Sequence, residues 1–222
     1  MSTSYAITAE EHRCDECGAG MAFPLFCDSC GADYPERSRM SAFGLLGLAR
    51  TFAIADVELD RRELRLAQRL HPDRWASRSS RLHRKALLAQ SAVNEALEAV
   101  RDPFRRAETL LALTDEQRSG ALDEAGKRLP PGFLMEQLEL QEAVQDGLDP
   151  DARKALKKQT RRELKRLRTV LEESFASLDV ADAALDPAVA RASTLETIAS
   201  TVSQSRYWRN IQTALRGESI PE

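Results

Sequence analysis

The sequence predicts an all-α protein with a small cysteine-rich module near its N-terminus, and three observations support this. Glycine (10) and proline (9) are scarce among 222 residues, and aromatic residues make up only 5%. From residue 42 onward, apolar residues recur every three or four positions, which is the period of an amphipathic helix. All four cysteines lie before this region, and we expect no strand outside the cysteine segment.

The cysteine segment contains two CxxC pairs, each followed by a glycine. This spacing lets both sulfurs of a pair reach one tetrahedral ion, and the following glycine can adopt a positive φ. A segment of about twenty residues cannot build an apolar core, so a metal would supply its folding free energy. We therefore expect a zinc-ribbon-like module in which structural zinc is held by four thiolates: Cys14, Cys17, Cys27 and Cys30.

Iron in a site of the rubredoxin type, a redox dithiol pair and disulfides are the other interpretations of these cysteines. Zinc is favoured over iron or a redox role by the double CxxC at this spacing. Disulfides are disfavoured because the N-terminal sequence has no apolar segment of a secretory signal. It also lacks the arginine-rich helix of a mitochondrial transit peptide, so we expect a cytoplasmic protein, most simply a bacterial one.

The next region predicts an antiparallel helical hairpin. Apolar residues at spacings of three and four mark its two helices: Leu59, Leu66 and Leu70, then Leu82, Ala86, Ala89, Val93, Leu97 and Val100. The residues 71–73 and the polar stretch 76–80 should form a loop between them, with Pro72 ending the first helix. Short helices are expected at 43–52 and at 103–111.

A second boundary falls at residues 114–131, which contain two glycines and a Pro-Pro pair. Beyond it, three amphipathic stretches with short joints predict a small helical bundle, at 132–147, 150–178 and 187–216. The expected domains are thus a metal module, a hairpin domain, a linker and a three-helix bundle, at 1–38, 39–115, 116–131 and 132–222.

The hairpin loop has the charge of a docking site for an acidic partner. The stretch 61–78 has only two acidic residues. It carries six arginines: Arg61, Arg62, Arg65, Arg69, Arg74 and Arg78. A rigid loop that offers His71 and Asp73 beside a basic helix face favours electrostatic docking.

The segment Leu70-His71-Pro72-Asp73-Arg74-Trp75 between two antiparallel helices resembles a J domain. Further segments resemble the HscB family, the co-chaperones of iron–sulfur cluster assembly, at 43–48, 94–96, 102–103, 106–107, 110–111 and 131–140. The resemblance covers residues 42–215, and the four-cysteine leader resembles the metal-binding extension that some members carry. Trp75 stands where phenylalanine is usual.

The resemblance implies an adaptor that activates an ATPase. His71, Pro72 and Asp73 would engage a heat-shock ATPase of the HscA or DnaK type and trigger its ATP hydrolysis. The basic residues that would hold this partner by charge are Arg61, Arg62, Arg65, Arg69 and Arg74. We do not expect an enzyme, because the chain has only three histidines and no glycine-rich phosphate loop.

The helix expected at 133–148 has two faces when its residues are placed 100° apart. One face would be buried in the bundle: Phe133, Gln137, Leu140, Val144 and Leu148. The other is an apolar stripe rimmed by carboxylates: Leu134, Met135, Leu138, Glu139, Glu142 and Asp146. The wheel alone leaves open whether this stripe is a binding patch or the margin of a wide core. The resemblance implies that it binds an IscU-type iron–sulfur scaffold protein.

Neither nucleic acid nor a membrane is an expected partner, because the formal net charge is −3. The helix at 152–168 carries nine Lys or Arg residues, but its leucines and Glu163 indicate an ordinary solvated helix face. The longest run of apolar residues and glycine, 42–49, is too short to span a bilayer. The sequence leaves open whether the metal module regulates the protein or joins two copies as a homodimer.

Overall fold

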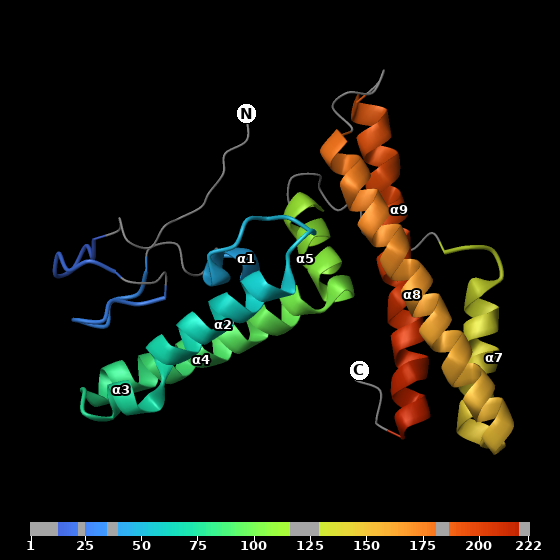
Figure 1. Ribbon diagram of the computed structural model, residues 1–222, viewed down its shortest axis with the longest axis horizontal. Coiled ribbons are helices and arrows are strands. Elements are labelled where there is room, and N and C mark those ends of the chain that lie inside the picture. The colour runs from blue at the N-terminus through green and yellow to red at the C-terminus, as the bar shows by residue number, and fades with distance from the viewer. Residues whose placement is uncertain (1–12, 22–24, 35–39, 116–128, 181–186, 218–222) are drawn as a thin grey trace. The chain divides into compact units, whose positions relative to one another are not determined.

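The computed structural model describes residues 13–21, 25–34, 40–115, 129–180 and 187–217. The chain forms two compact units, Met1–Leu110 and Leu111–Glu222, each of which is described by itself (Figure 1). In the described residues all regular structure is helical, apart from two isolated antiparallel bridges in the cysteine segment. The all-α prediction is confirmed. None of the described helices combines the length and the apolar character needed to cross a bilayer.

The first unit opens its helical part with α1 (Ala42–Leu46), capped by the hydroxyl of Ser41, which accepts the N–H of Gly44 at 3.3 Å. The helix ends at Gly47, whose φ of 64° is left-handed and suits glycine. The predicted helix at 43–52 was therefore too long, because this turn stops it.

The predicted hairpin consists of α2 (Asp56–Leu70) and α4 (Ser80–Arg101), which lie along each other in Figure 1. The apolar residues that marked the two helices are buried, including Leu59 at 0% and Ala89 at 0% exposure. Arg101 at the end of α4 donates to Asp60 at 3.0 Å and to Glu63 at 2.7 Å near the start of α2. The two helices are thus antiparallel.

The tip of the hairpin carries a short helix, α3 (Pro72–Ala76), where the sequence predicted a loop. Pro72 does end α2, but it also occupies the first position of α3, where its fixed φ and missing N–H are tolerated. His71 caps α3, because its Nδ1 accepts the N–H of Asp73 at 3.3 Å. Trp75 is buried, and its indole Nε1 donates to the carbonyl of Arg69 at 3.0 Å.

Helix α5 (Pro103–Asp115) follows after Asp102, whose carboxylate accepts the N–H groups of Phe104 and Arg105 at 3.0 and 2.8 Å. The side chain of Arg106 is buried and donates through Nε to the carbonyl of Val100 at 2.6 Å. This arginine ties the start of α5 to the end of α4.

The second unit contains α7 (Phe133–Asp146), α8 (Pro150–Val180) and α9 (Pro187–Arg216), within two residues of the predicted ranges. Helix α9 packs along α8 and also against α7. One part of the core brings residues of all three helices together: Leu156, Ile211 and Leu215, with Leu140, Val144 and Leu148 packed against them. Arg153 of α8 donates to the carbonyl of Leu215 in α9 at 2.6 Å.

Candidate functional site

The four cysteines form one cluster that can hold a metal ion. Their Sγ atoms all lie within 4.8 Å of one another. The Sγ–Sγ distance is 3.6 Å between Cys14 and Cys30 and 3.7 Å between Cys17 and Cys27. Metal–sulfur bonds of about 2.3 Å in a tetrahedron require sulfur–sulfur distances of about 3.8 Å. The cysteines therefore fit a single ion with four thiolate ligands.

Two similar turns present these thiols. In the first, Gly18 donates to the carbonyl of Cys14 at 2.8 Å. In the second, Gly31 donates to the carbonyl of Cys27 at 2.9 Å. Both glycines have a positive φ, 71° and 77°, as their position after each CxxC pair predicts. We call the segment 25–34 the second CxxC turn.

Two of the thiols, those of Cys17 and Cys27, differ in how readily they ionise. Burial opposes ionisation of Cys27, but the N–H groups of Cys30 and Ser29 outweigh it and lower the pKa of its thiol to about 7. The N–H of Ala19 favours ionisation of Cys17, yet desolvation and the neighbouring thiols raise its pKa to about 12. A bound cation would favour the thiolate form of all four.

The second CxxC turn packs against the tip of the hairpin, which the sequence did not predict. The rings of Phe26 and Trp75 lie 5.1 Å apart. A Cβ on Gly31 would lie 3.1 Å from Cδ2 of Leu82, so this turn approaches α4 closely. Asp33 forms an ion pair with Lys85 of α4. The one feature of the sequence that could have indicated this contact is Trp75, whose ring is larger than that of the phenylalanine usual at this position in the family that the sequence resembles.

Asp28 in the same turn is half-buried, and burial raises the pKa of its carboxyl group. The positive charges that oppose this shift belong to Arg69, Arg74 and Arg78, which lie around the tip. Part of the basic flank therefore also acts on the cysteine segment.

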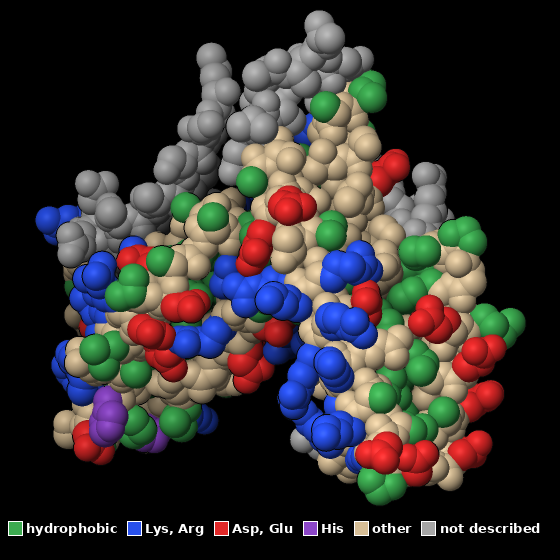
Figure 2. Space-filling model, turned by 45° about the vertical axis from the view of Figure 1, so that its right-hand side comes forward, with side chains coloured by type: hydrophobic (Ala, Val, Ile, Leu, Met, Phe, Trp, Pro, Cys, Tyr) green, Lys and Arg blue, Asp and Glu red, His purple; other side chains and the backbone are tan. Residues whose placement is uncertain are grey.

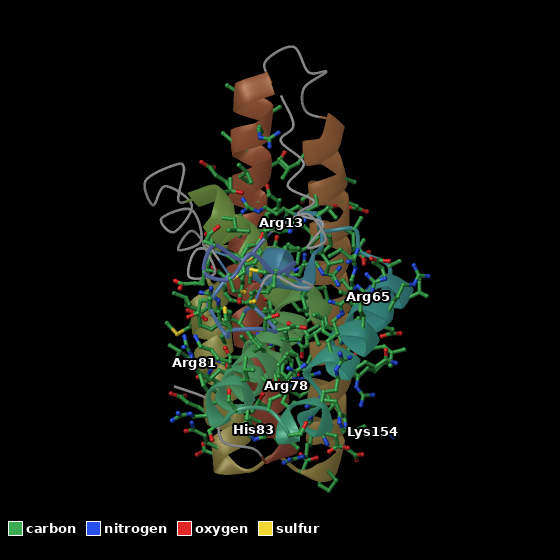
Figure 3. The ribbon with its side chains drawn as sticks, turned by 90° about the vertical axis from the view of Figure 1, so that its left-hand side faces the viewer. Arg13, Arg65, Arg78, Arg81, His83 and Lys154 are labelled. Atoms are coloured by element: carbon green, nitrogen blue, oxygen red, sulfur yellow. The ribbon has the colours of Figure 1, made fainter. Side chains whose placement is uncertain are left out.

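The tip displays the residues that the sequence singled out for docking. His71 and Asp73 have side chains that are 59% and 89% exposed, and Pro72 and Arg74 are also exposed. Among the basic residues of α2, Arg61 and Arg65 are exposed, whereas Arg62 and Arg69 are partly buried. Figure 3 shows Arg65 on α2 and Arg78 and His83 near the tip.

Charge is organised at two places on the hairpin, near the start of α2 and beside the tip. Arg62 donates to Glu58 at 2.8 Å, and this hydrogen bond holds the pKa of the Glu58 carboxyl below its usual range. A shallow pocket opens beside α3 and is lined largely by polar and basic residues: Ala76, Arg78, Ser80, His83 and Arg84.

Helix α7 divides into the two faces that the wheel predicted. Phe133 and Gln137 are buried, whereas Leu134, Met135 and Leu138 are 49%, 64% and 54% exposed. The carboxylates of the predicted rim are also exposed: Glu139, Glu142 and Asp146. Figure 2 shows apolar and acidic side chains interleaved on the right-hand part of the surface, which includes α7. The six residues thus lie together on one accessible face.

Tyr207 of α9 contacts the buried side of α7, which also contains a buried amide. Tyr207 of α9 lies edge-on to Phe133, with ring centroids 5.6 Å apart, while Trp208 is buried and contributes nothing to the exposed face. Neither side-chain polar atom of Gln137 has a hydrogen-bond partner among the described residues, although both are buried. The wheel placed Gln137 in the core and gave no reason for an amide there.

The basic face of α8 is largely exposed, and basic side chains form a band in the lower half of Figure 2. Arg166 and Arg168 pair with Glu163 and Glu172, each at 2.8 Å. Neighbouring acidic side chains of the same helix thus neutralise part of this face.

Comparisons with known proteins agree with this architecture. Residues 129–216 match the model of the HSCB C-terminal oligomerisation domain. A co-chaperone protein HscB homolog of Chromobacterium violaceum is 39% identical over 134 residues, which are 60% of this chain and 75% of that protein. One of Burkholderia vietnamiensis is 34% identical over 169 residues, 73% of this chain and 91% of that protein.

Two solved structures share the fold. The crystal structure of the human co-chaperone protein HscB aligns with a TM-score of 0.65 and 21% identity, over 95% of this chain and 100% of that chain. The chaperone HscB from Vibrio cholerae aligns with a TM-score of 0.50 and 27% identity, over 78% of this chain and 98% of that chain.

Proposed function

The chain belongs to the HscB family of co-chaperones, and on this premise we propose that it is a cytoplasmic adaptor between two proteins. It delivers an IscU-type iron–sulfur scaffold protein to a chaperone ATPase of the HscA or DnaK type and stimulates ATP hydrolysis by that chaperone. Hydrolysis would lock the chaperone onto the scaffold and promote transfer of the cluster to recipient proteins. The energy comes from the partner's ATP.

The exposed tip at the junction of α2 and α3 is the observation that carries this proposal. His71 Nδ1 accepts the N–H of Asp73, which leaves the Nε2 of the exposed ring for contact with a partner. The carboxylate of Asp73 is almost fully exposed and can accept a cation of the partner. Pro72 fixes the backbone between them.

The basic residues beside the tip supply the attraction toward an acidic ATPase surface. We assign this role to Arg61, Arg62, Arg65, Arg69 and Arg74. Charges of this kind steer the encounter and raise the association rate more than they raise final affinity. Binding through them should therefore weaken as salt increases.

The exposed face of α7 supports the second half of the proposal. An apolar centre within an acidic rim is typical of a protein interface, and Met135 can adapt its shape to a partner. We assign the scaffold to Leu134, Met135, Leu138, Glu139, Glu142 and Asp146.

For the cysteine cluster we propose structural zinc, with iron as the second candidate. Four thiolates in a tetrahedron suit both ions, and zinc in such a closed site is stabilising rather than reactive. Elemental analysis of the purified protein distinguishes them, with one zinc per chain as the expected result. Iron would also give visible absorption, which zinc, with its filled d shell, does not.

A single-turnover ATPase assay tests the adaptor role. The chaperone is loaded with ATP, and the chain and the scaffold are added separately and together. We expect the His71→Gln variant to lose the stimulation while its helical circular dichroism is unchanged. His83→Gln is the matched control, because His83 is half-buried at the start of α4 and is not among the residues assigned to docking, so it should stimulate like the wild type. Full stimulation by His71→Gln would refute the proposal.

A further inference from the structure

We propose that, when the four cysteines hold their metal, the second CxxC turn packs against the chaperone-docking tip and keeps it ordered, so that docking of the chaperone depends on the metal. We call this packing the brace. The inference rests on the proposed function only in taking the tip as the chaperone-binding surface. The brace itself is a property of the first unit and can be measured without any partner.

The brace begins at Trp75, two residues after Asp73. Its indole is anchored on one side by the hydrogen bond to the carbonyl of Arg69 in α2. On the other side, its ring contacts that of Phe26, which is 0% exposed. Trp75 is therefore held between α2 and the second CxxC turn, and it is itself only 4% exposed.

Two further contacts join the turn to the first turns of α4. Gly31 approaches Leu82 so closely that a Cβ would meet Cδ2 at 3.1 Å. Asp33 pairs with Lys85, whose side chain is 23% exposed. These residues and Phe26 lie within a few positions of the ligands Cys27 and Cys30, so the geometry of the metal site determines where all of them sit.

In the described part of the cysteine segment, the apolar cluster around the thiols is small, with Met21 and Tyr34 buried beside Cys14 and Cys27. Because a structural metal supplies folding free energy directly, loss of the metal should release this segment from the hairpin.

The tip is poorly suited to remain ordered alone. Helix α3 has five residues, and an isolated helix of that length is unstable. Without Phe26, one side of Trp75 loses its packing, and only the contacts of α3 with α2 and α4 are left to hold it in place. If only a fraction of molecules then has an ordered tip, the apparent dissociation constant for the chaperone rises by the inverse of that fraction.

Hydrogen exchange of the full chain tests the brace. The zinc-loaded protein is compared with protein whose zinc has been removed by a chelator, and with the zinc-loaded Phe26→Ala variant. We expect amides of residues 69–78 to exchange about tenfold faster in both altered forms. Residues 89–100 in the middle of α4 serve as the internal reference and should exchange as before. Phe26→Ala should still bind one zinc, and removing that zinc should add little further exchange at the tip.

Trp75→Phe provides a second variant if Phe26→Ala does not fold, because it keeps an aromatic ring in the hairpin but shortens its reach. In the Trp75→Phe variant, the hydrogen-exchange rates of residues 69–78 should no longer depend on whether zinc is bound. Unchanged exchange at 69–78 after the zinc has left the wild-type protein would overturn the brace.

The ATPase assay separates this inference from the function on which it rests. Zinc removal and Phe26→Ala should each raise the concentration needed for half-maximal stimulation by about three- to tenfold. If His71→Gln stimulates normally, the proposed function fails while the exchange result still stands. If the exchange is independent of zinc and His71→Gln is inactive, the brace fails and the function stands.

Discussion

The guanidinium group of Arg106 lies over the ring of Phe52, 5.6 Å from its centroid, and its Nη1 donates to the backbone carbonyl of the same residue at 2.8 Å. Together with the bond to Val100, this places one buried cation at the meeting point of three segments: α4, α5 and the chain before α2. Arg106 lies in a segment that resembles the HscB family, but nothing in the sequence indicates its structural role.

Arg106→Ala should lower the free energy of unfolding of the first unit by about 2–4 kcal/mol, because two buried carbonyls lose their donor. Arg106→Lys should recover only part of this, since one ammonium cannot reproduce the planar fork of donors. Urea titration that follows Trp75 emission in a Trp208→Phe background gives the measurement. Arg105→Ala, which removes an exposed pair with Glu98, should cost less than about 1 kcal/mol. Equal losses at the two positions would contradict this interpretation.

The two glycines of the CxxC turns should respond differently to alanine. Both have a positive φ, so both variants acquire backbone strain of about 1–2 kcal/mol. Only at Gly31 does the new Cβ also meet Leu82, whereas nothing lies within 4 Å of a Cβ on Gly18. Gly31→Ala should therefore speed hydrogen exchange at the tip, and Gly18→Ala should not. Adding Leu82→Ala should relieve part of the defect of Gly31→Ala but not that of Gly18→Ala.

Metal affinity should fall as the pH falls, and the dependence should steepen below pH 7. Binding requires thiolates, so each protonated thiol must release a proton. Cys17, with a pKa of about 12, releases its proton across this whole range. Cys27, with a pKa of about 7, is mostly ionised above pH 7 and adds about one more proton below it. Competition titrations with a chromophoric zinc chelator between pH 6 and 8 measure the slope, and a constant slope would contradict the prediction.

Replacing Met135 and Leu138 together by alanine should weaken binding of an IscU-type scaffold by about tenfold or more, because apolar interface area is lost. Both side chains are more than half exposed, so helicity and stability should change little. Val189→Ala is the matched control, since it removes an exposed apolar side chain from α9 of the same unit. Isothermal titration with the scaffold gives the affinities, and unchanged binding by the double variant would refute the assignment.

The long helices could be predicted from sequence because their signal is a repeated one. Helices α7, α8 and α9 were located to within two residues, since many apolar positions share one period and glycine or proline marks most of their ends. Prediction failed for the short helices because they are too short to contain a repeated signal. Helix α1 is too brief to show a period, and α3 begins at Pro72, a residue that in the sequence indicates only the end of α2.

The cysteine cluster was also predictable, because its ligands are close in sequence and their spacing is tied to tetrahedral geometry. The contact between Phe26 and Trp75 was not, since the two residues are far apart in the chain and belong to no common pattern. Exposure of the tip and of the α7 face agrees with the roles assigned to them. Those roles depend on partners, and they stay predictions that the ATPase and binding experiments address.

The shielding of Trp75 by Phe26 also bears on how long the protein survives in a cell. The ribosome makes the cysteine segment before the hairpin, so the four thiols can bind an ion before the tip that packs against them is complete. In a cell that lacks the metal, newly made chains would expose the Trp75 side chain and a partly unfolded tip to proteases. The amount of this protein in the cell should then rise and fall with the metal concentration, even when its gene is transcribed at a constant rate.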